Sequence, residues 1–233
     1  MRGGRAASDP CADWESRHVD RLRRDTATLG LGHLRAELIP RAFRELAAAA
    51  FGAGDGIVRL EAHASANGTV RLLGVPRTLG PDSSVWKASI SEVRHPGAHA
   101  WSRVKLCSEP SLAQARGLRR RAGVDEALLV DAAGYVIEGT RSNLVVVDSS
   151  GAALTPDLAR GGVHGIAYEV LCERVPELQH RNIPAIQLRD ARELIAINSV
   201  RGARAIVTLD GIRIGTGRVG PWAKRLAKIL TTD

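Results

Sequence analysis

Aromatic residues and long apolar runs are both scarce in this sequence of 233 residues. Phe, Trp and Tyr make up only 3% of it, too few for the stacked aromatic platform of single-stranded nucleic-acid binders. No apolar run approaches the roughly 20 residues that a membrane-spanning helix needs. The basic residues among the first five are followed by no apolar segment, so we expect no secretory signal and no membrane partner.

Cysteines are equally few. The sequence contains three, Cys11, Cys107 and Cys172, and no C-x-x-C spacing. An odd number without paired spacing argues against a disulfide framework and against a structural zinc site. We therefore expect reduced thiols, a cytoplasmic protein and no metal centre.

Acidic residues are outnumbered by basic ones. The 33 Lys and Arg against 25 Asp and Glu give a net charge of +8, which raises nucleic-acid binding as a competing hypothesis. The basic residues are spread along the chain, with one dense run at 119–121, and no recognisable nucleic-acid module accompanies them. Solvated helix faces are the simpler interpretation, and part of the charge can attract an anionic cofactor or substrate.

Turn-forming residues divide the chain into two predicted domains. Hydrophobic residues make up 44% of the sequence, enough for a substantial core. Residues 74–84 contain two prolines and two glycines and form the candidate linker. We place a small domain at residues 1–78 and a larger one at 79–233.

The small domain is predicted to contain two helices and a hairpin. Apolar spacing indicates helices over residues 14–30 and 34–51, and strands at 57–60 and 69–73 are joined around Asn67-Gly68. Glycines after residue 51 end the second helix. Its inward side is predicted to comprise Leu38, Phe43, Leu46, Ala47 and Ala50.

The larger domain is predicted to begin with a strand at 85–90, followed by a turn at 94–97 and a helix over 111–122. His95 and His99 lie at the turn, where exposed rather than catalytic histidines are the usual case. Between them and the helix, a short strand-like segment at 101–106 carries Lys105. Flanking Val104 and Leu106 would desolvate the Lys105 amine in part and lower its pKa.

A carboxylate follows the next pair of strands. An apolar strand at 127–130, a turn at 131–134 and a second apolar segment at 135–137 lead to Glu138, and another apolar strand follows at 144–147. A buried carboxylate at this place needs a partner. Taken alone, Glu138 is better interpreted as a solvent-facing residue beside a glycine turn.

Downstream, a helix is predicted to begin at Gly165-Ile166-Ala167 and run to about residue 175. A glycine-led helix start is a suitable anion site because its first backbone amides have no acceptor within the helix.

These elements together resemble the class IV (fold-type IV) pyridoxal-phosphate enzymes. The E-G-x-x-S-N pattern at 138–143 matches the signature of that family, and Lys105 precedes Glu138 by the expected spacing, 138 − 105 = 33 residues. The resemblance implies that Lys105 forms the Schiff base with pyridoxal phosphate. It also implies that Glu138 keeps the ring nitrogen protonated, so that the ring acts as an electron sink.

The resemblance also implies the other cofactor-binding residues. An H-x-x-R-L segment at 18–22 supplies Arg21 for the phosphate, and a guanidinium suits phosphate oxygens. In the family a threonine stands where this sequence has Ala167, so a hydroxyl is lost while the backbone donors remain. The full expected set is Arg21, Lys105, Glu138, Ser142, Asn143, Ile166, Ala167 and Ser199.

As a fold, the resemblance implies a two-domain α+β chain with a small α/β N-terminal domain and a larger C-terminal domain with a barrel-like sheet. The resemblance also implies three further elements: a strand at 193–198 that ends in Asn198-Ser199, a hairpin turn at 209–211 and a closing helix over 219–230. The first strands of the small domain are expected to be abbreviated, because the chain starts almost at the H-x-x-R-L segment. The cofactor is expected between the domains, and a homodimer is expected to complete the pocket.

Three functions stay open on the sequence. The first is an aminotransferase that exchanges an amino group between an amino acid and a 2-oxo acid. The second is 4-amino-4-deoxychorismate lyase, acting on an amino-chorismate substrate, to which the stretches at 124–136 and 198–202 bear some likeness. The third is a cofactor-free scaffold or basic nucleic-acid-binding protein on the same fold, against which the presence of both Lys105 and Glu138 argues.

Overall fold

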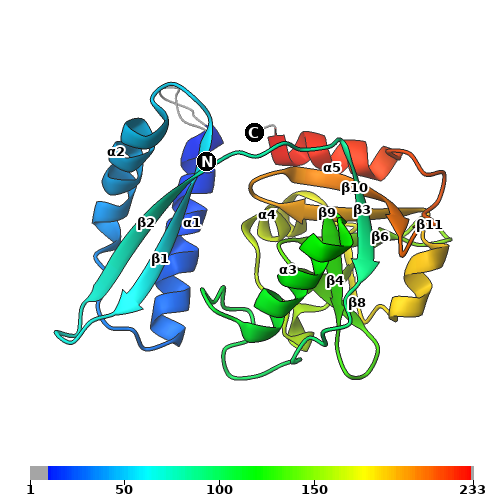
Figure 1. Cartoon of the computed structure of the whole chain (residues 1–233), viewed down its shortest axis with the longest axis horizontal. Helices are drawn as coiled ribbons and strands as arrows, with labels where there is room; N and C mark the ends of the chain where they lie inside the picture. Colours follow the sequence, from blue (N-terminus) through cyan, green and yellow to red (C-terminus); the bar gives the residue numbers. More distant parts are fainter. Residues whose placement is uncertain (1–9, 232–233) are drawn as a thin grey trace. The chain divides into compact units, whose positions relative to one another are not determined.

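The chain forms two compact units in a computed structural model that describes residues 10–231, with side chains from residue 14 onward. The units are Met1–Asp82 and Ser83–Asp233. Both are drawn in Figure 1. The sequence-based boundary after residue 78 coincides with the end of the last strand of the N-terminal unit, and the division itself falls four residues later.

The N-terminal unit packs helices against a hairpin. Asn67 closes the hairpin as predicted, because its side-chain Oδ1 accepts from the Thr69 amide while Ser65 and Thr69 are bonded through their backbones. The two strands pair antiparallel over their whole length, Gly56 opposite Thr78 to Ala64 opposite Val70. The elements are α1 (Pro10–Thr28), the 3₁₀ turn η1 (Ala36–Leu38), α2 (Ile39–Phe51), β1 (Gly56–Ala64) and β2 (Val70–Thr78).

The predicted linker at 74–84 is wrong in its first half, because β2 continues to Thr78. Each strand of a two-stranded sheet has an unpaired edge, where Pro76 is tolerated. Gly74 has a packing role there, since a Cβ at this position would lie 2.4 Å from Leu46 Cδ2. Glycine and proline in the segment 74–84 therefore belong to two structures. Gly74 and Pro76 lie in the strand β2, and Gly80 and Pro81 lie in the connection that follows it.

The inward face predicted for the second helix is only partly correct. Phe43 is buried and Leu46 and Ala47 are half-buried, but Leu38 is 47% exposed and Ala50 is also exposed. The reason is that the helix is not continuous from residue 34. Leu38 closes a 3₁₀ turn with a tighter period, so that Ile39 takes the inward position in its place.

The C-terminal unit is built on a nine-stranded mixed sheet with the order β5-β4-β3-β10-β9-β6-β7-β8, and β11 pairs with β10. In Figure 1, β9 and β10 run across the direction of β3 and β4, so the sheet is strongly curled. The strands are β3 (Val85–Ile90), β4 (Glu126–Val130), β5 (Val136–Gly139), β6 (Asn143–Val147), β7 (Ala153–Pro156), β8 (Gln179–Arg181), β9 (Glu193–Asn198), β10 (Gly202–Leu209) and β11 (Ile212–Arg213).

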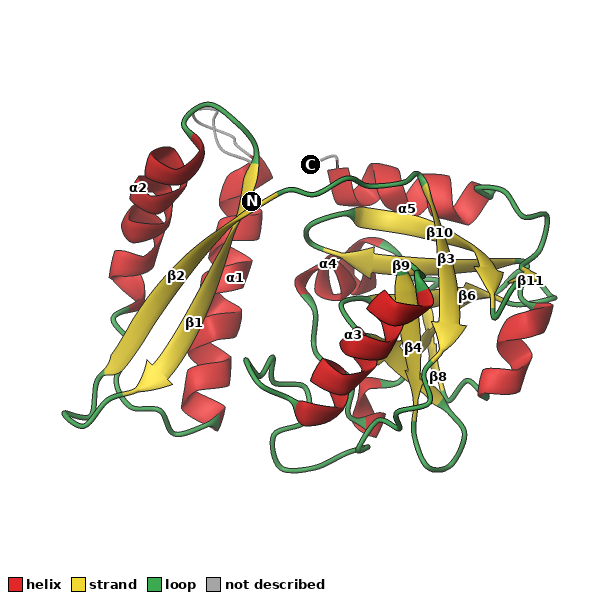
Figure 2. Ribbon diagram, in the orientation of Figure 1, coloured by secondary structure: helices red, strands yellow, loops and turns green. Residues whose placement is uncertain are grey.

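Helices cover this sheet. In Figure 2, α5 lies along β10, and α3 connects the parallel pair β3 and β4. Every residue of β4, β5 and β6 is buried, as expected for strands inside a covered sheet. The helices are α3 (Pro110–Ala122), α4 (Ile166–Arg174) and α5 (Pro221–Thr231), with 3₁₀ turns η2 (Leu158–Arg160) and η3 (Ala185–Asp190).

The mixed α+β architecture expected from the sequence is therefore confirmed. Cys107 is exposed and Cys172 is half-buried, and the Cys11 side chain lies outside the described residues. Within residues 10–231, no helix combines the length and the apolar character required to cross a lipid bilayer.

The basic run at the end of α3 was expected to be a solvated face. Arg120 and Arg121 are exposed, in agreement. Arg119 is not, because its Nη1 donates to the Asp125 carbonyl and its Nε is buried. Burial lowers the pKa of Arg119, and the neighbouring Arg141 charge acts in the same direction. Arg119 is therefore packed against the protein, and its hydrogen bond to Asp125 supports the start of β4.

Candidate active site

The segment between η2 and α4 connects the parts of the predicted site in the C-terminal unit. The Val163 amide donates to Glu138 Oε2 at 3.0 Å, and the Val163 carbonyl accepts from Asn143 Nδ2 at 2.9 Å. The next residue, His164, donates its amide to the Arg103 carbonyl at 3.1 Å. These bonds bring three segments together just before α4. They are the end of β5, the start of β6 and the loop that carries Lys105.

Glu138 is buried, which excludes the solvent-facing interpretation. It is 4% exposed on β5, opposite Leu129 of β4. Its Oε2 is bonded to Val163, whereas Oε1 has no hydrogen-bond partner among the residues that the structure describes. A buried acceptor without a donor is costly, and such groups mark places where a ligand completes the bonding.

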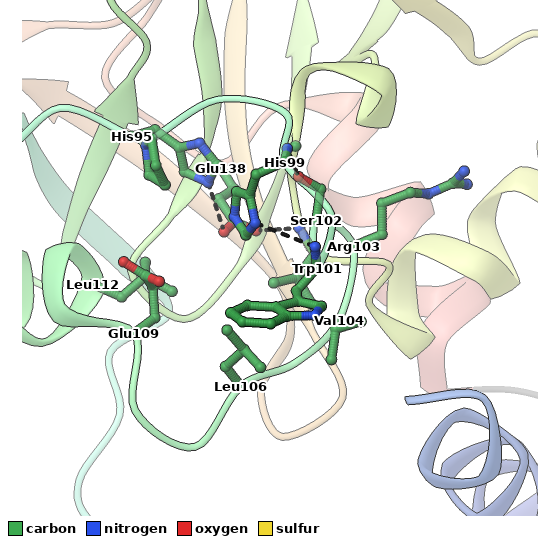
Figure 3. Close-up of a pocket in the computed structure, with 13 residues that line it drawn as sticks. His95, His99, Trp101, Ser102, Arg103, Val104, Leu106, Glu109, Leu112 and Glu138 are labelled. Carbon is green, nitrogen blue, oxygen red and sulfur yellow. Dashed lines mark hydrogen bonds and ion pairs between the residues drawn. The ribbon is translucent and has the colours of Figure 1, made fainter. Parts of the chain in front are cut away.

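A hollow opens beside this carboxylate (Figure 3). It encloses about 320 Å³, including a part open to solvent. Its lining includes Glu138 and Val163 together with Val104 and Leu106, the two neighbours of Lys105. Glu109 also faces the hollow, where its side chain caps α3, and the hydrogen bond from Ser111 lowers the pKa of Glu109.

His95 also lines the hollow, and the expectation that it is exposed is wrong. The side chain is 6% exposed, because the His95 amide donates to the Val130 carbonyl and fastens the segment to the end of β4. His99 is exposed, as expected. Sequence reasoning missed His95 because nothing in a turn pattern indicates which side chain folds back onto a strand.

Lys105 lies in a loop rather than in the strand predicted at 101–106. That segment forms turns, and Arg103 has a positive φ of 73°. Val104 is buried, but the Lys105 side chain is exposed, so the predicted desolvation is wrong for this conformation. Val104 and Leu106 line the hollow, whereas Lys105 between them does not, so apolar neighbours in the sequence do not by themselves bury the amine.

Ser142 and Asn143 contact the scaffold. Ser142 Oγ donates to Glu126 Oε2 at 2.7 Å, and Asn143 bonds to the Val163 carbonyl. Glu126 is a fully buried carboxylate that sequence reasoning missed. Its Oε1 accepts from the Thr140 amide and hydroxyl at 3.0 and 2.6 Å, so it holds the loop between β5 and β6. A glutamate directly ahead of the buried run 127–130 was the available signal.

The start of α4 has the features of an anion site. Gly165 precedes the helix without a side-chain cap, so the amides of Ile166 and Ala167 are in the uncapped first turn. A Cβ at Gly165 would lie 2.2 Å from Asn143 Oδ1, which explains the glycine. Ser199 lies in the turn between β9 and β10, at the end of the sheet where Asn143 pairs with Ile197.

Arg21 belongs to the N-terminal unit, where it is half-buried on α1. The other predicted site residues all belong to the C-terminal unit. Within that unit, hydrogen bonds connect both Glu138 and Asn143 to Val163, three residues before α4 begins, and sheet pairing places Ser199 at the same end of β6.

Comparison with known proteins gives branched-chain-amino-acid aminotransferases among the relatives. A probable branched-chain-amino-acid aminotransferase from Aquifex aeolicus is 31% identical over 109 residues, which are 45% of this chain and 35% of that protein. The branched-chain-amino-acid aminotransferase of Escherichia coli K12 is 28% identical over 141 residues, or 54% of this chain and 45% of the relative. The matched stretches thus span less than half the length of these relatives.

Solved structures share the fold at lower identity. The 4-amino-4-deoxychorismate lyase from Pseudomonas aeruginosa superimposes with a TM-score of 0.80 at 24% identity, covering 94% of this chain and 84% of that one. The branched-chain aminotransferase from Escherichia coli gives 0.75 at 18% identity, covering 92% and 77%. The model of the amino-transferase class IV family matches residues 13–209. Because that match covers most of the sequence, the chain belongs to the class IV aminotransferase family.

Proposed function

We propose that this protein is a pyridoxal-phosphate-dependent aminotransferase that moves an amino group between an amino acid and a 2-oxo acid. One observation carries the proposal. Glu138 Oε1 is buried at the hollow without a hydrogen-bond partner in the described part of the chain, next to the uncapped start of α4. A carboxylate beside an anion site matches a ligand that has a protonated ring nitrogen and a phosphate.

The residues present fit this cofactor. Glu138 offers an acceptor, and the first turn of α4 offers amide donors. Lys105 supplies a primary amine from the loop that lines the hollow through its neighbours. Once bound, the cofactor would supply an electron sink for charge that develops on the substrate carbon.

Each residue then has a defined task. The Glu138 carboxylate favours a charged N–H donor opposite Oε1, since a neutral acceptor there would leave that oxygen unpaired. The amides of Ile166 and Ala167, together with Ser199, bind phosphate oxygens. Lys105 holds and moves the proton at the substrate carbon, for which its amine must be deprotonated. Val104 and Leu106 place apolar surface around the reacting groups and exclude water.

The proposal is tested at Lys105. The protein is incubated with pyridoxal phosphate, reduced with borohydride and mapped by peptide mass spectrometry. We expect the pyridoxyl group on Lys105. Label on Lys87 or Lys224 would overturn the assignment, and a protein that takes up no label and shows no visible absorption band would support the cofactor-free alternative.

Arg21 is the phosphate ligand proposed from the N-terminal unit. Loss of a bidentate, charge-assisted contact costs on the order of 1.5–3 kcal/mol, so Arg21→Ala should weaken cofactor binding roughly ten- to a hundredfold. Arg24→Ala, an exposed neighbour on the same helix, is the matched control and should leave the affinity unchanged. Equal affinities of the two variants, measured by titration, would remove Arg21 from the site.

A second candidate is 4-amino-4-deoxychorismate lyase, favoured by the structural similarity to the enzyme from Pseudomonas aeruginosa. The reactions have different products. An aminotransferase converts a branched-chain amino acid and 2-oxoglutarate into glutamate and a branched-chain 2-oxo acid, whereas the lyase releases pyruvate and 4-aminobenzoate without an amino acceptor. Assaying both substrate sets with one preparation decides between them. A homodimer is proposed as the active form, to be measured by sedimentation.

A further inference from the structure

A buried histidine faces the unpaired oxygen of Glu138, and no step described so far uses it. Nε2 of His95 lies 3.7 Å from Glu138 Oε1, and both side chains are about 5% exposed. Figure 3 shows the imidazole directed at the carboxylate. The distance is longer than an N–H···O hydrogen bond, so the groups are aligned but not bonded.

The hydrogen bond made by Nδ1 of His95 determines which ring nitrogen carries the proton. The Gly97 amide donates to His95 Nδ1 at 3.0 Å. A nitrogen that accepts a hydrogen bond carries no proton, so the neutral ring bears its proton on Nε2. The group directed at Glu138 is therefore an N–H donor, and the contact is that of a neutral donor with a carboxylate.

Other titratable groups that face the hollow are engaged elsewhere. Glu109 accepts from the Ser111 amide and hydroxyl at the start of α3. The His99 Nδ1 accepts from the Trp101 amide. Arg103 also lines the hollow, but its side chain is exposed. His95 is the buried donor among them, and a small movement of its ring would bring Nε2 within bonding distance of Oε1.

We propose that His95 is a positioning residue for Glu138. The Gly97 amide holds the ring at Nδ1, and the Nε2–H is the second partner of the carboxylate and keeps Oε1 directed into the hollow. A carboxylate oxygen has two lone pairs, so it can accept from His95 and from a ligand at once. The inference rests on the proposed function, in which Glu138 accepts from the cofactor, and it adds the residue that prepares Glu138 for this role.

The test titrates the Glu138 carboxyl in cofactor-free protein by ¹³C NMR, with Glu138→Gln identifying the signal. In His95→Asn the Asn Oδ1 can still accept from Gly97, but the side chain is too short to reach the position of Nε2. We expect the titration midpoint of the Glu138 signal to lie at higher pH than in wild type, because a donor to the charged form is lost. In His95→Gln the amide nitrogen replaces Nε2, and the midpoint should stay near that of wild type.

His99→Asn is the control for any histidine at the hollow and should leave the midpoint unchanged. Equal midpoints in wild type and His95→Asn would overturn the proposal. The proposal would also be overturned if the midpoint rose as much in His95→Gln or in His99→Asn as in His95→Asn. A rise in His95→Gln would assign the effect to packing, and a rise in His99→Asn would assign it to the general electrostatic field at the hollow. Because the titration needs no cofactor, absence of pyridoxal phosphate binding would defeat the proposed function and leave this test valid.

A measurement on wild type keeps the proposal testable if the His95 variants do not fold. ¹⁵N NMR of the imidazole at neutral pH should show Nε2 protonated and Nδ1 unprotonated for His95. The opposite tautomer would place a lone pair against the carboxylate and overturn the proposal.

Discussion

Two buried carboxylates lie on neighbouring antiparallel strands and differ in how they are bonded. On β4, both oxygens of Glu126 accept hydrogen bonds, from Thr140, Ser142 and the Ala127 amide. On β5, one oxygen of Glu138 accepts from Val163, while the other has no partner within the described residues. A fully bonded carboxylate holds a loop in place, whereas a half-bonded one at a hollow is available to a ligand.

The largest effect on stability is expected at the fully bonded carboxylate. Glu126→Leu removes the carboxylate acceptor of the Ala127 amide and of the buried Thr140 and Ser142 hydroxyls, at about 1–3 kcal/mol for each unpaired group. We expect the free energy of unfolding to fall by about 3–5 kcal/mol in urea denaturation. Glu138→Leu is the matched change and frees one amide, so its loss should be clearly smaller. Equal losses would contradict the comparison.

The next effect separates chemistry from stability. Glu138→Gln keeps the shape of the side chain but cannot balance a charged ring nitrogen, so turnover should fall roughly a hundredfold, or about 2.8 kcal/mol in the barrier. Cofactor affinity and the unfolding free energy should change much less, because the loss acts on the reacting state. Steady-state kinetics and urea denaturation on the same preparation measure both quantities. Wild-type turnover would remove Glu138 from the mechanism.

A smaller effect is expected at Ser142, which the sequence placed among the cofactor ligands. Its hydroxyl donates to buried Glu126, so Ser142→Ala should cost about 1–2 kcal/mol of unfolding free energy. Exposed Ser149→Ala is the control and should cost almost nothing. If Ser142→Ala instead left stability intact and weakened pyridoxal phosphate binding, the serine would be a ligand rather than part of the support.

The smallest effect concerns a third carboxylate, Asp131, which has a charged partner. Burial by itself raises the pKa of Asp131, but the Tyr135 amide and the Arg160 guanidinium outweigh it, so the net pKa is lowered. A lowered folded pKa adds stability above the unfolded value of about 3.9, and that stability is lost as the pH falls through the folded pKa. Wild type should therefore exceed Asp131→Asn in unfolding free energy at neutral pH, and the difference should shrink in acid. A pH-independent difference would contradict the ionic role.

Much of the fold could be predicted because its signals are local. The strand at 85–90, the hairpin turn at Asn67-Gly68 and the helix after Gly165 appear in the structure where turn residues and apolar spacing placed them. Strands β7, β8 and β10 were not predicted, and neither was the second half of β2, which contains glycine and proline for reasons of packing and edge position. These reasons depend on α2 and on the number of strands in the sheet, which no local pattern contains.

The candidate site was predicted less completely. The spacing of Lys105 and Glu138 indicated the family, and the family model matches the chain. The burial of His95 and the bonding of Glu126 were not predicted, because they depend on groups that lie elsewhere in the chain, the Val130 carbonyl for His95 and Thr140 and Ser142 for Glu126. The exposed Lys105 was not predicted either, since consecutive turns at 101–106 have no distinctive residue pattern.

The sequence by itself determined several of the strands and helices, the family, and the identity of the residues proposed for the chemistry. These properties depend on short-range periodicity and on motif spacing. Only the tertiary structure decided that Glu126 is fully bonded while Glu138 keeps a free acceptor beside His95. The physical reason is that a buried polar group is satisfied or left open by partners that the fold delivers, such as Val163, which lies 25 residues from Glu138 along the chain.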